Sequence, residues 1–181
     1  RDPGGASFRL AASPASATMT ARLAPRLLAL LLLGHSVLHF VLGCLLGLTG
    51  DEAHYALYAT HLALSYYDHP PLVGWIQAPL VALDVPDGVL RLVPELLWVL
   101  TALFICAAAR RLQALLAPAT GDTQDAGWWA VLAYSLAPLL HILGIGLVPD
   151  SLLMFFTAAL LGGFLTLLDR RPALAGLCLG L

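Results

Sequence analysis

The sequence predicts an all-α fold, a polytopic bundle of membrane-spanning helices. Hydrophobic residues account for 60% of the 181 residues, charged residues for 11%, and the mean hydropathy is +0.86. A soluble globular domain is only about half apolar, so this composition excludes one. The net charge of −2 provides no basic surface, and we expect no nucleic-acid partner.

The first membrane span is predicted at residues 27–48, a run long enough as a helix to cross the hydrocarbon core. Arg22 and Arg26 precede it. A cleaved signal peptide is the alternative, but the apolar run is too long for one and continues past Cys44, where a lipoprotein-type motif would be cut. Residues 1–24 are expected to be a disordered or non-native extension, because most of them are small or polar.

Three further complete spans and the start of a fifth follow. Each is an apolar run bounded by charged residues, a proline or a polar loop. They are predicted at residues 89–109, 126–147, 152–168 and, cut off by the end of the chain, 173–181. Because the chain begins with arginine and stops within an apolar run, we expect it to be the N-terminal part of a longer protein and inactive by itself.

Paired arginines predict the topology. They fall in alternate connections between the spans, at residues 22 and 26, 110 and 111, and 170 and 171. The positive-inside rule places these connections and the N-terminus in the cytoplasm. Residues 49–88 and the turn before the fourth span then lie outside. Asp51, Glu52, Asp68, His69 and Asp150 would then share that outer face.

Two short helices are predicted to lie on the bilayer surface in the first outer loop, at residues 52–65 and 71–83. The first has a wide apolar face beside a narrow polar stripe, which is typical of an interfacial helix. The prolines at 70 and 71 separate the two helices, because a residue before proline disfavours helical conformation. The stripe consists of His54, Tyr58, His61 and Ser65.

An acidic pair beside the first span is the strongest functional signal. Asp51 and Glu52 follow the span directly in a chain that has few charges. Charged groups beside lipid are costly to place. The pair therefore indicates chemistry at the membrane surface.

Four segments, in their order and spacing, resemble the polyprenyl-phosphate-dependent glycosyltransferases of family 39. This family includes protein O-mannosyltransferases and the aminoarabinose transferase of lipid A. The segments are residues 50–55 (GDEAHY), 67–72 (YDHPPL), 91–94 (RLVP) and 148–153 (VPDSLL).

The resemblance implies a GT-C membrane fold and an enzyme that moves a sugar from a polyprenyl-phosphate carrier to a hydroxyl group, with inversion. It implies an integral protein of the bacterial inner (plasma) membrane, with its active site on the outer, periplasmic face. The partners would be the lipid-linked sugar, the surrounding membrane lipid and an acceptor that is a lipid, a glycan or a protein.

The resemblance also assigns catalysis to the acidic pair. Asp51 matches the family's catalytic aspartate, and a carboxylate at the membrane surface can accept the proton of the acceptor hydroxyl as a general base. The alternative is that Asp51 caps the N-terminus of the helix that follows. Glu52 would order the site, or would be a solvated residue in the first helical turn.

Four residues are candidates for binding the substrate: Tyr55, His69, Arg91 and Asp150. His69 stands where several relatives carry lysine, and its alternative is a structural residue of the turn. Arg91 would contact the phosphate, order the loop, or be neutralised by Glu95 one turn on. Asp150 matches the family's second acidic position, and its alternative is a helix cap.

No cofactor is expected. A divalent metal is the alternative, because the outer face carries several residue types that bind metals. Their spacing matches no common zinc motif. The potential ligands are His54, His61, Asp68 and His69. A different pair, His35 and His39, lies one helical turn apart within the first span and is expected to face other helices.

A small multi-spanning transporter or a non-catalytic membrane assembly protein is the alternative class of function. A transporter would place functional polar residues at broken helices near the middle of the bilayer. The acidic groups of the outer face instead fall at predicted helix ends, which favours the enzyme.

Overall fold

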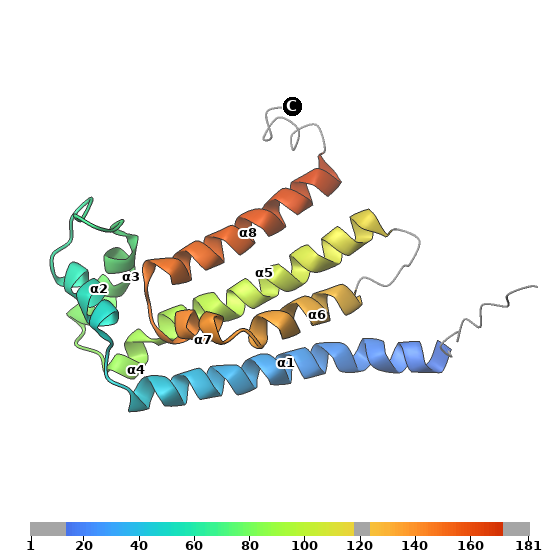
Figure 1. Ribbon diagram of the computed structural model, residues 1–181, viewed down its shortest axis with the longest axis horizontal. Helices are drawn as coiled ribbons and strands as arrows, with labels where there is room; N and C mark the ends of the chain where they lie inside the picture. Colours follow the sequence, from blue (N-terminus) through green and yellow to red (C-terminus); the bar gives the residue numbers. More distant parts are fainter. Residues whose placement is uncertain (1–13, 118–123, 172–181) are drawn as a thin grey trace, which may run out of the picture.

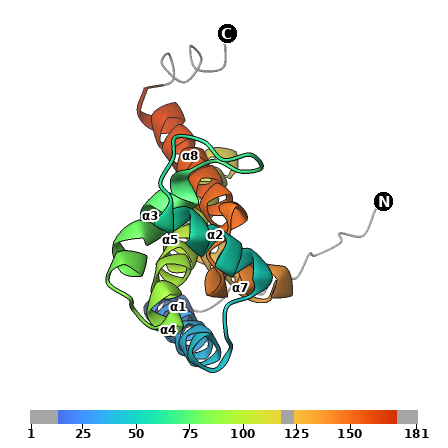
Figure 2. The ribbon, with the colours of Figure 1, turned by 90° about the vertical axis from the view of Figure 1, so that its left-hand side faces the viewer.

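The computed structural model describes residues 14–117 and 124–171, and within these ranges every regular element is a helix. Helix α5 lies between α1 and α8, and α2, α3 and α4 gather at one end of the bundle (Figures 1 and 2). The helices are α1 (Pro14–Leu45), α2 (Gly50–Thr60), α3 (Leu72–Ala82), α4 (Asp87–Leu90), α5 (Leu92–Leu116), α6 (Gln124–Ser135), α7 (Pro138–Ile145) and α8 (Pro149–Arg170).

Three helical stretches are long and apolar enough to cross a membrane. A fourth span results if the bent pair α6–α7 is taken as one. The protein is therefore an all-α integral membrane helix bundle, as its composition predicts. The predicted fifth span at residues 173–181 lies outside the described residues. The three stretches are Pro25–Leu45, Asp87–Leu116 and Pro149–Leu168.

The span predicted at residues 126–147 is broken. Helix α6 ends at Ser135, α7 begins at Pro138, and the two meet at an angle of 75°. Pro138 explains the break, because proline donates no backbone hydrogen bond and its ring clashes with the preceding turn. Ala137, the residue before it, is extended, with φ −86° and ψ 106°, as expected before proline.

Two other helices run past their predicted ends. Helix α1 begins at Pro14, so residues 14–24, which were expected to form a disordered or non-native extension, are helical. Proline suits a first helical position, and the alanines that follow favour a helix. Residues 1–13 lie outside the described part. Helix α5 continues beyond residue 109 to Leu116, because Arg, Leu, Gln and Ala are all strong helix formers.

Helix α2 ends earlier than predicted, at Thr60. The ring of Tyr66 stacks on Tyr58 with 3.7 Å between centroids. Its hydroxyl lies 2.8 Å from the carbonyl oxygens of both Tyr58 and His61, at the end of the helix. A side chain from the following loop thus satisfies carbonyls that would otherwise be left open. His61 and Ser65 therefore lie beyond α2, and the predicted continuous polar stripe is wrong.

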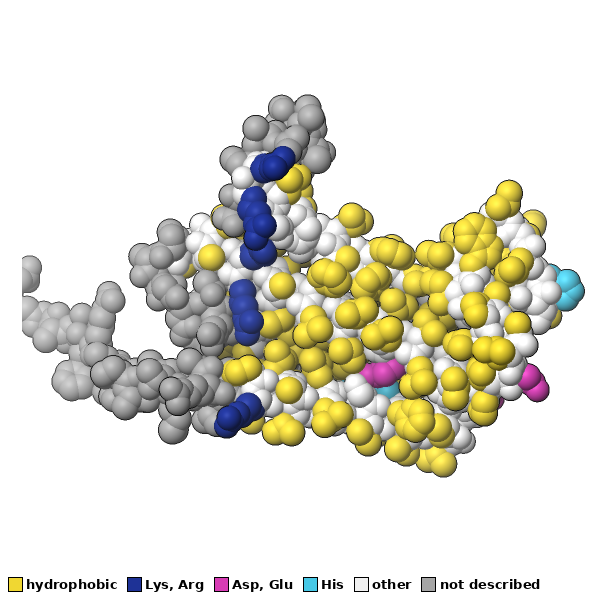
Figure 3. Space-filling view, turned by 180° about the vertical axis from the view of Figure 1, so that it is seen from behind, with side chains coloured by type: hydrophobic (Ala, Val, Ile, Leu, Met, Phe, Trp, Pro, Cys, Tyr) yellow, Lys and Arg dark blue, Asp and Glu magenta, His cyan; other side chains and the backbone are white. Residues whose placement is uncertain are grey.

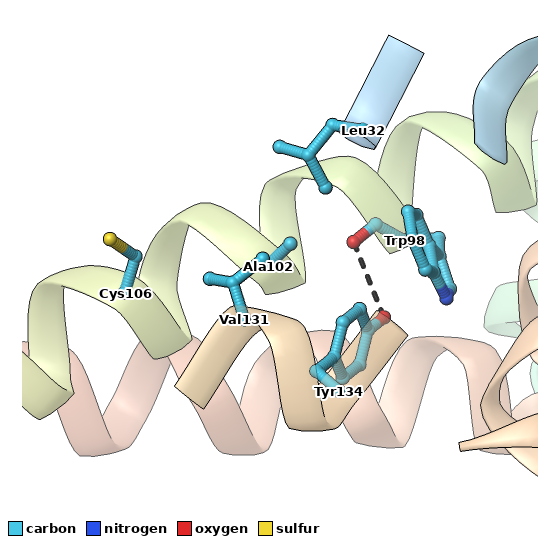
Figure 4. Close-up of a cluster of buried hydrophobic side chains, with 6 residues drawn as sticks. All are labelled: Leu32, Trp98, Ala102, Cys106, Val131 and Tyr134. Atoms are coloured by element: carbon cyan, nitrogen blue, oxygen red, sulfur yellow. Dashed lines mark hydrogen bonds between the residues drawn. The ribbon is translucent and has the colours of Figure 1, made fainter. Parts of the chain in front are cut away.

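The larger buried cluster forms where α1, α5 and α6 meet. Trp98 and Ala102 are fully buried at its centre, and the Tyr134 hydroxyl donates to the Trp98 carbonyl oxygen over 3.3 Å (Figure 4). Its members are Leu32, Trp98, Ala102, Cys106, Val131 and Tyr134. This cluster fixes α5 as the central helix of the bundle.

Charge is divided between the two ends of the molecule. Arginine side chains form a band across one end, and histidine and acidic side chains reach the surface at the other (Figure 3). The apolar flanks between the two ends are broken on this face by an acidic group with a histidine beside it. The arginine pairs therefore gather at one end, as their alternation along the sequence predicts. The described arginines that reach the surface are Arg26, Arg110, Arg111, Arg170 and Arg171.

Candidate functional site at the acidic end

The acidic end of the bundle is built by α2, α3 and the turn from α7 into α8 (Figure 2). Tyr55 of α2 is 7% exposed at its centre. Burial raises the pKa of the Tyr55 phenol, and the negative charges of Asp51, Asp68 and Asp150 raise it further. Tyr55 therefore lies within electrostatic reach of acidic residues from α2, the following loop and α8, although these residues lie far apart in the sequence.

Asp51 is the second residue of α2 and its side chain is exposed. The helix is capped by Thr49 instead. The Glu52 backbone N–H donates to the Thr49 hydroxyl over 3.3 Å, and the Thr49 N–H donates to Glu52 Oε2 over 2.9 Å. The proposal that Asp51 serves as the N-cap is therefore wrong, because this reciprocal capping box already occupies the helix end. The Asp51 carboxylate is directed to solvent at the acidic end.

Glu52 is buried and forms a two-pronged ion pair with Arg91. Arg91 donates from Nε to Oε1 over 2.7 Å and from Nη2 to Oε2 over 2.8 Å. Burial by itself would raise the pKa of Glu52, but the hydrogen bonds from Arg91 and Thr49 outweigh it and hold the pKa below its usual value. Glu52 is thus an ionised structural residue, and the alternative of a solvated first-turn glutamate is wrong.

The remaining donors of Arg91 close the end of α1. Nη1 donates to the carbonyl oxygens of Gly43 over 2.8 Å and Leu46 over 2.5 Å, and Nη2 donates to that of Gly47 over 2.9 Å. All five guanidinium N–H groups are therefore used within the protein. Arg91 does not pair with Glu95, contrary to one of the alternatives. Because its donors are already used, Arg91 is better placed to order the loop than to contact a phosphate.

Asp68 is held in the loop between α2 and α3 by two residues of α2. The Tyr58 hydroxyl donates to Asp68 Oδ1, and His54 Nε2 lies 3.1 Å from Oδ2 and 3.0 Å from the Tyr58 oxygen. The Tyr58 hydrogen bond is the main cause of the lowered pKa of Asp68. Burial, followed by the bond to Asp68, raises the pKa of Tyr58 to about 12. The sequence did not reveal this pairing, although His54 and Tyr58 lie one helical turn apart.

His69 joins the same group. Its ring stands edge-on to Tyr55 with 5.2 Å between centroids, and its Nε2 lies 4.0 Å from Asp68 Oδ2. The side chain is partly exposed, at 38%. His69 therefore exposes part of its ring at the surface beside Tyr55 and the carboxylate of Asp68.

Asp150 occupies the second position of α8, and Val148 is the residue before the helix. Its predicted alternative as the helix cap is therefore wrong. The side chain is exposed and borders an apolar cavity of about 540 Å³ between α5, α7 and α8. The walls include Leu139, Leu143, Leu153, Met154 and Ala158. Asp150 thus lies at the edge of a cavity whose walls are mostly apolar.

The described residues contain no group of three or more His, Cys, Asp or Glu side chains arranged to hold a metal ion. His61 lies beyond the end of α2, where its Nδ1 is 2.7 Å from the Thr60 hydroxyl. The four potential ligands considered from the sequence are therefore not assembled into a metal site.

Part of the chain is similar to a protein of known function. It is 26% identical over 133 residues to the lipid A galacturonosyltransferase RgtD of Rhizobium johnstonii (strain DSM 114642 / LMG 32736 / 3841). The aligned region is 72% of this chain and 26% of the relative, so the chain spans about a quarter of that protein's length. No known family profile and no solved structure matches the chain. The similarity supports a relationship to glycosyltransferases in the broad sense.

Proposed function

We propose that this chain belongs to a membrane glycosyltransferase of the GT-C type. It would move a sugar from a polyprenyl-phosphate carrier to a hydroxyl acceptor on the non-cytoplasmic face. The observation that carries the proposal is that Asp51 and Asp150 both lie at the acidic end within electrostatic reach of Tyr55, and that Asp150 borders an apolar cavity. A lipid-linked sugar needs this combination, because its carrier stays in the membrane while its sugar reacts at the surface.

In this mechanism Asp51 is the general base. The acceptor hydroxyl oxygen attacks the anomeric carbon, the bond from that carbon to the carrier phosphate breaks, and the hydroxyl proton passes to Asp51. The phosphate leaves with the electron pair of the broken bond, and the configuration at the anomeric carbon is inverted. The exposed Asp51 carboxylate has the access to an incoming acceptor that this role requires.

His69 is the candidate to bind the departing phosphate, since its ring lies beside Tyr55 and reaches the surface. A phosphate favours the charged imidazolium and would accept its N–H. Asp150 would orient the sugar hydroxyls at the mouth of the cavity, and Tyr55 would form the floor between the carboxylates. The ion pair of Glu52 and Arg91 would support this arrangement, because it fixes α2 to α1 and α5.

The orientation in the membrane follows from the same proposal. The band of arginines would face the cytoplasm, and the acidic end would face the periplasm of a bacterial inner membrane. We expect reporter fusions after residue 85 and after residue 120 to give opposite readouts, with the first outside. Identical readouts from the two fusions would rule out the topology, and the proposed mechanism with it.

The activity itself can be tested with the full-length protein in membrane vesicles. We expect transfer from a polyprenyl-phosphate-linked sugar, and no transfer from the corresponding nucleotide sugar, because only the lipid-linked donor can enter the apolar cavity from the bilayer. Lipid A-like lipids, glycans and a protein acceptor would be offered in parallel. Transfer from the nucleotide sugar alone would contradict the proposal.

A transporter is the second candidate, and one observation favours it. The α6–α7 break brings His141 to His39 and Glu95 within the bundle, and polar groups at a broken helix are the arrangement that a transporter predicts. Uptake of a labelled solute into proteoliposomes, without any transfer of sugar, would support this class. The similarity to a glycosyltransferase and the carboxylates at the surface favour the enzyme.

A further inference from the structure

A chain of polar groups links four helices inside the bundle. Glu95 Oε2 of α5 lies 2.5 Å from His39 Nδ1 of α1, and His39 Nε2 lies 2.7 Å from His141 Nδ1 of α7. His141 Nε2 lies 2.8 Å from the carbonyl oxygen of Ser135 at the end of α6. The His39 side chain is 1% exposed and that of Glu95 12%. None of these groups has a part in the sugar transfer proposed above.

The three hydrogen bonds in this chain require three protons. The last acceptor is a carbonyl oxygen, so His141 must carry its proton on Nε2 and accept at Nδ1. His39 must then donate from Nε2. Its Nδ1 can face Glu95 favourably only if a proton lies between them. Two neutral histidines supply two protons, so the group must hold one more, either on the Glu95 carboxyl or on an imidazole.

The surroundings agree with this proton count. The Ser36 hydroxyl of α1 donates to the other Glu95 oxygen over 2.5 Å. His35 is stacked on His141 at 4.9 Å, but its Nδ1 is directed at the Leu31 carbonyl oxygen, 2.8 Å away. The charge of Arg91, one turn before Glu95, is already compensated by Glu52. The additional proton therefore makes Glu95, His39 and His141 neutral as a group, which a buried site beside lipid favours.

The titratable groups that interact electrostatically with His141 come from α1 and α5. His35 and His39 face it from α1, and Glu95 faces it from α5. Tyr134 of α6 is in contact with Trp98, which itself stacks on His141 at 5.4 Å. The Tyr134 hydroxyl is directed to the Trp98 carbonyl oxygen.

The group also determines where α7 lies. Gly144 is so close to α1 and α5 that a Cβ atom there would come within 2.8 Å of Trp98 and 2.9 Å of His39. At the end of α7 the Ser151 hydroxyl lies 2.8 Å from the Leu143 carbonyl oxygen and 2.9 Å from that of Gly146. These contacts join α7 to the first turn of α8, in which Asp150 lies.

We propose that Glu95, His39 and His141 share one additional proton and form a latch that holds α7 against α1 and α5. The latch thereby positions the turn that carries Asp150. Loss of the proton leaves a net negative charge in the bundle and one of the three hydrogen bonds unmade. The latch is therefore closed at lower pH and weakens as pH rises through the release of the proton.

The matched variants are Glu95→Gln and Glu95→Ala. A glutamine amide donates to His39 Nδ1 while its oxygen accepts from Ser36, so it reproduces the protonated carboxyl and completes all three bonds with two neutral histidines. Alanine removes the first bond altogether. Hydrogen–deuterium exchange of residues 138–148 in the full-length protein reports on α7. A peptide from the middle of α8 reports on the rest of the fold.

At about pH 6 we expect protection of residues 138–148 in Glu95→Gln to stay within about twofold of the wild-type protein, and that in Glu95→Ala to fall about tenfold. Between about pH 6 and about pH 10, wild-type protection, corrected for the intrinsic pH dependence of exchange, should fall while that of Glu95→Gln stays constant. An equal loss of protection of residues 138–148 in both variants at pH 6 would overturn the proposal. A parallel pH response of wild type and Glu95→Gln would also overturn it, even if Glu95→Ala fails to fold.

Discussion

Asp51→Asn in the full-length protein is expected to lower turnover by about 10² or more, with the lipid donor still bound. The substitution keeps the shape of the side chain and removes its ability to accept a proton. It leaves the capping of α2 intact, because Thr49 and Glu52 form the cap and Asp51 does not. The measurement is the single-turnover rate of sugar transfer, together with the affinity for the polyprenyl-phosphate donor.

Asp84→Asn is the matched control. Asp84 is an exposed aspartate in the same outer segment, and its φ of 51° is a left-handed conformation that asparagine also tolerates. It should leave turnover unchanged. Asp150→Asn separates the two acidic positions at Tyr55, since a role in orienting the sugar raises KM more than it lowers kcat. Normal turnover in Asp51→Asn would defeat its assignment as the base.

The sequence predicted an all-α membrane helix bundle because its long apolar runs suffice to identify helices that can cross a bilayer. It failed where one side chain changes the course of such a run. Pro138 lies within residues 126–147, and the apolar residues on both sides concealed the break that it causes. The early end of α2 has a tertiary cause, the Tyr66 hydroxyl over the last carbonyls, and helical periodicity carries no information about it.

The candidate site, too, was predicted from the sequence only in part. The alternation of arginines predicted that Asp51 and Asp150 share one face, and in the structure both lie within electrostatic reach of Tyr55. The sequence did not reveal which side chains pair between different helices of the bundle. An ion pair with Glu95, one turn on, was one of the alternatives for Arg91, yet Arg91 pairs with Glu52, and Glu95 pairs with His39 of α1. A single sequence reveals neighbours along a helix, whereas these pairs depend on how helices pack.

Arg91→Met is expected to destabilise the protein by about 3–5 kcal/mol, because it leaves the buried Glu52 carboxylate without its positively charged partner. It also leaves the carbonyl oxygens of Gly43, Leu46 and Gly47 without their donor. Arg91→Lys should recover only part of the loss, since an ammonium group cannot bridge a carboxylate and three carbonyls at once. The measurement is the free energy of unfolding in detergent. Arg26→Met, at an exposed position of α1, is the control and should have little effect.

The pH dependence of this loss identifies its cause. The pKa of Glu52 is lowered in the folded protein, so the ion pair contributes its full stability above the ordinary glutamate pKa of about 4.3 and loses it as pH falls through the lower folded value. The difference in unfolding free energy between wild type and Arg91→Met should therefore shrink in acid. The double variant Arg91→Met/Glu52→Met should be more stable than Arg91→Met, because no unpaired charge stays buried. A stable Arg91→Met protein with weakened donor binding would instead assign Arg91 to the phosphate.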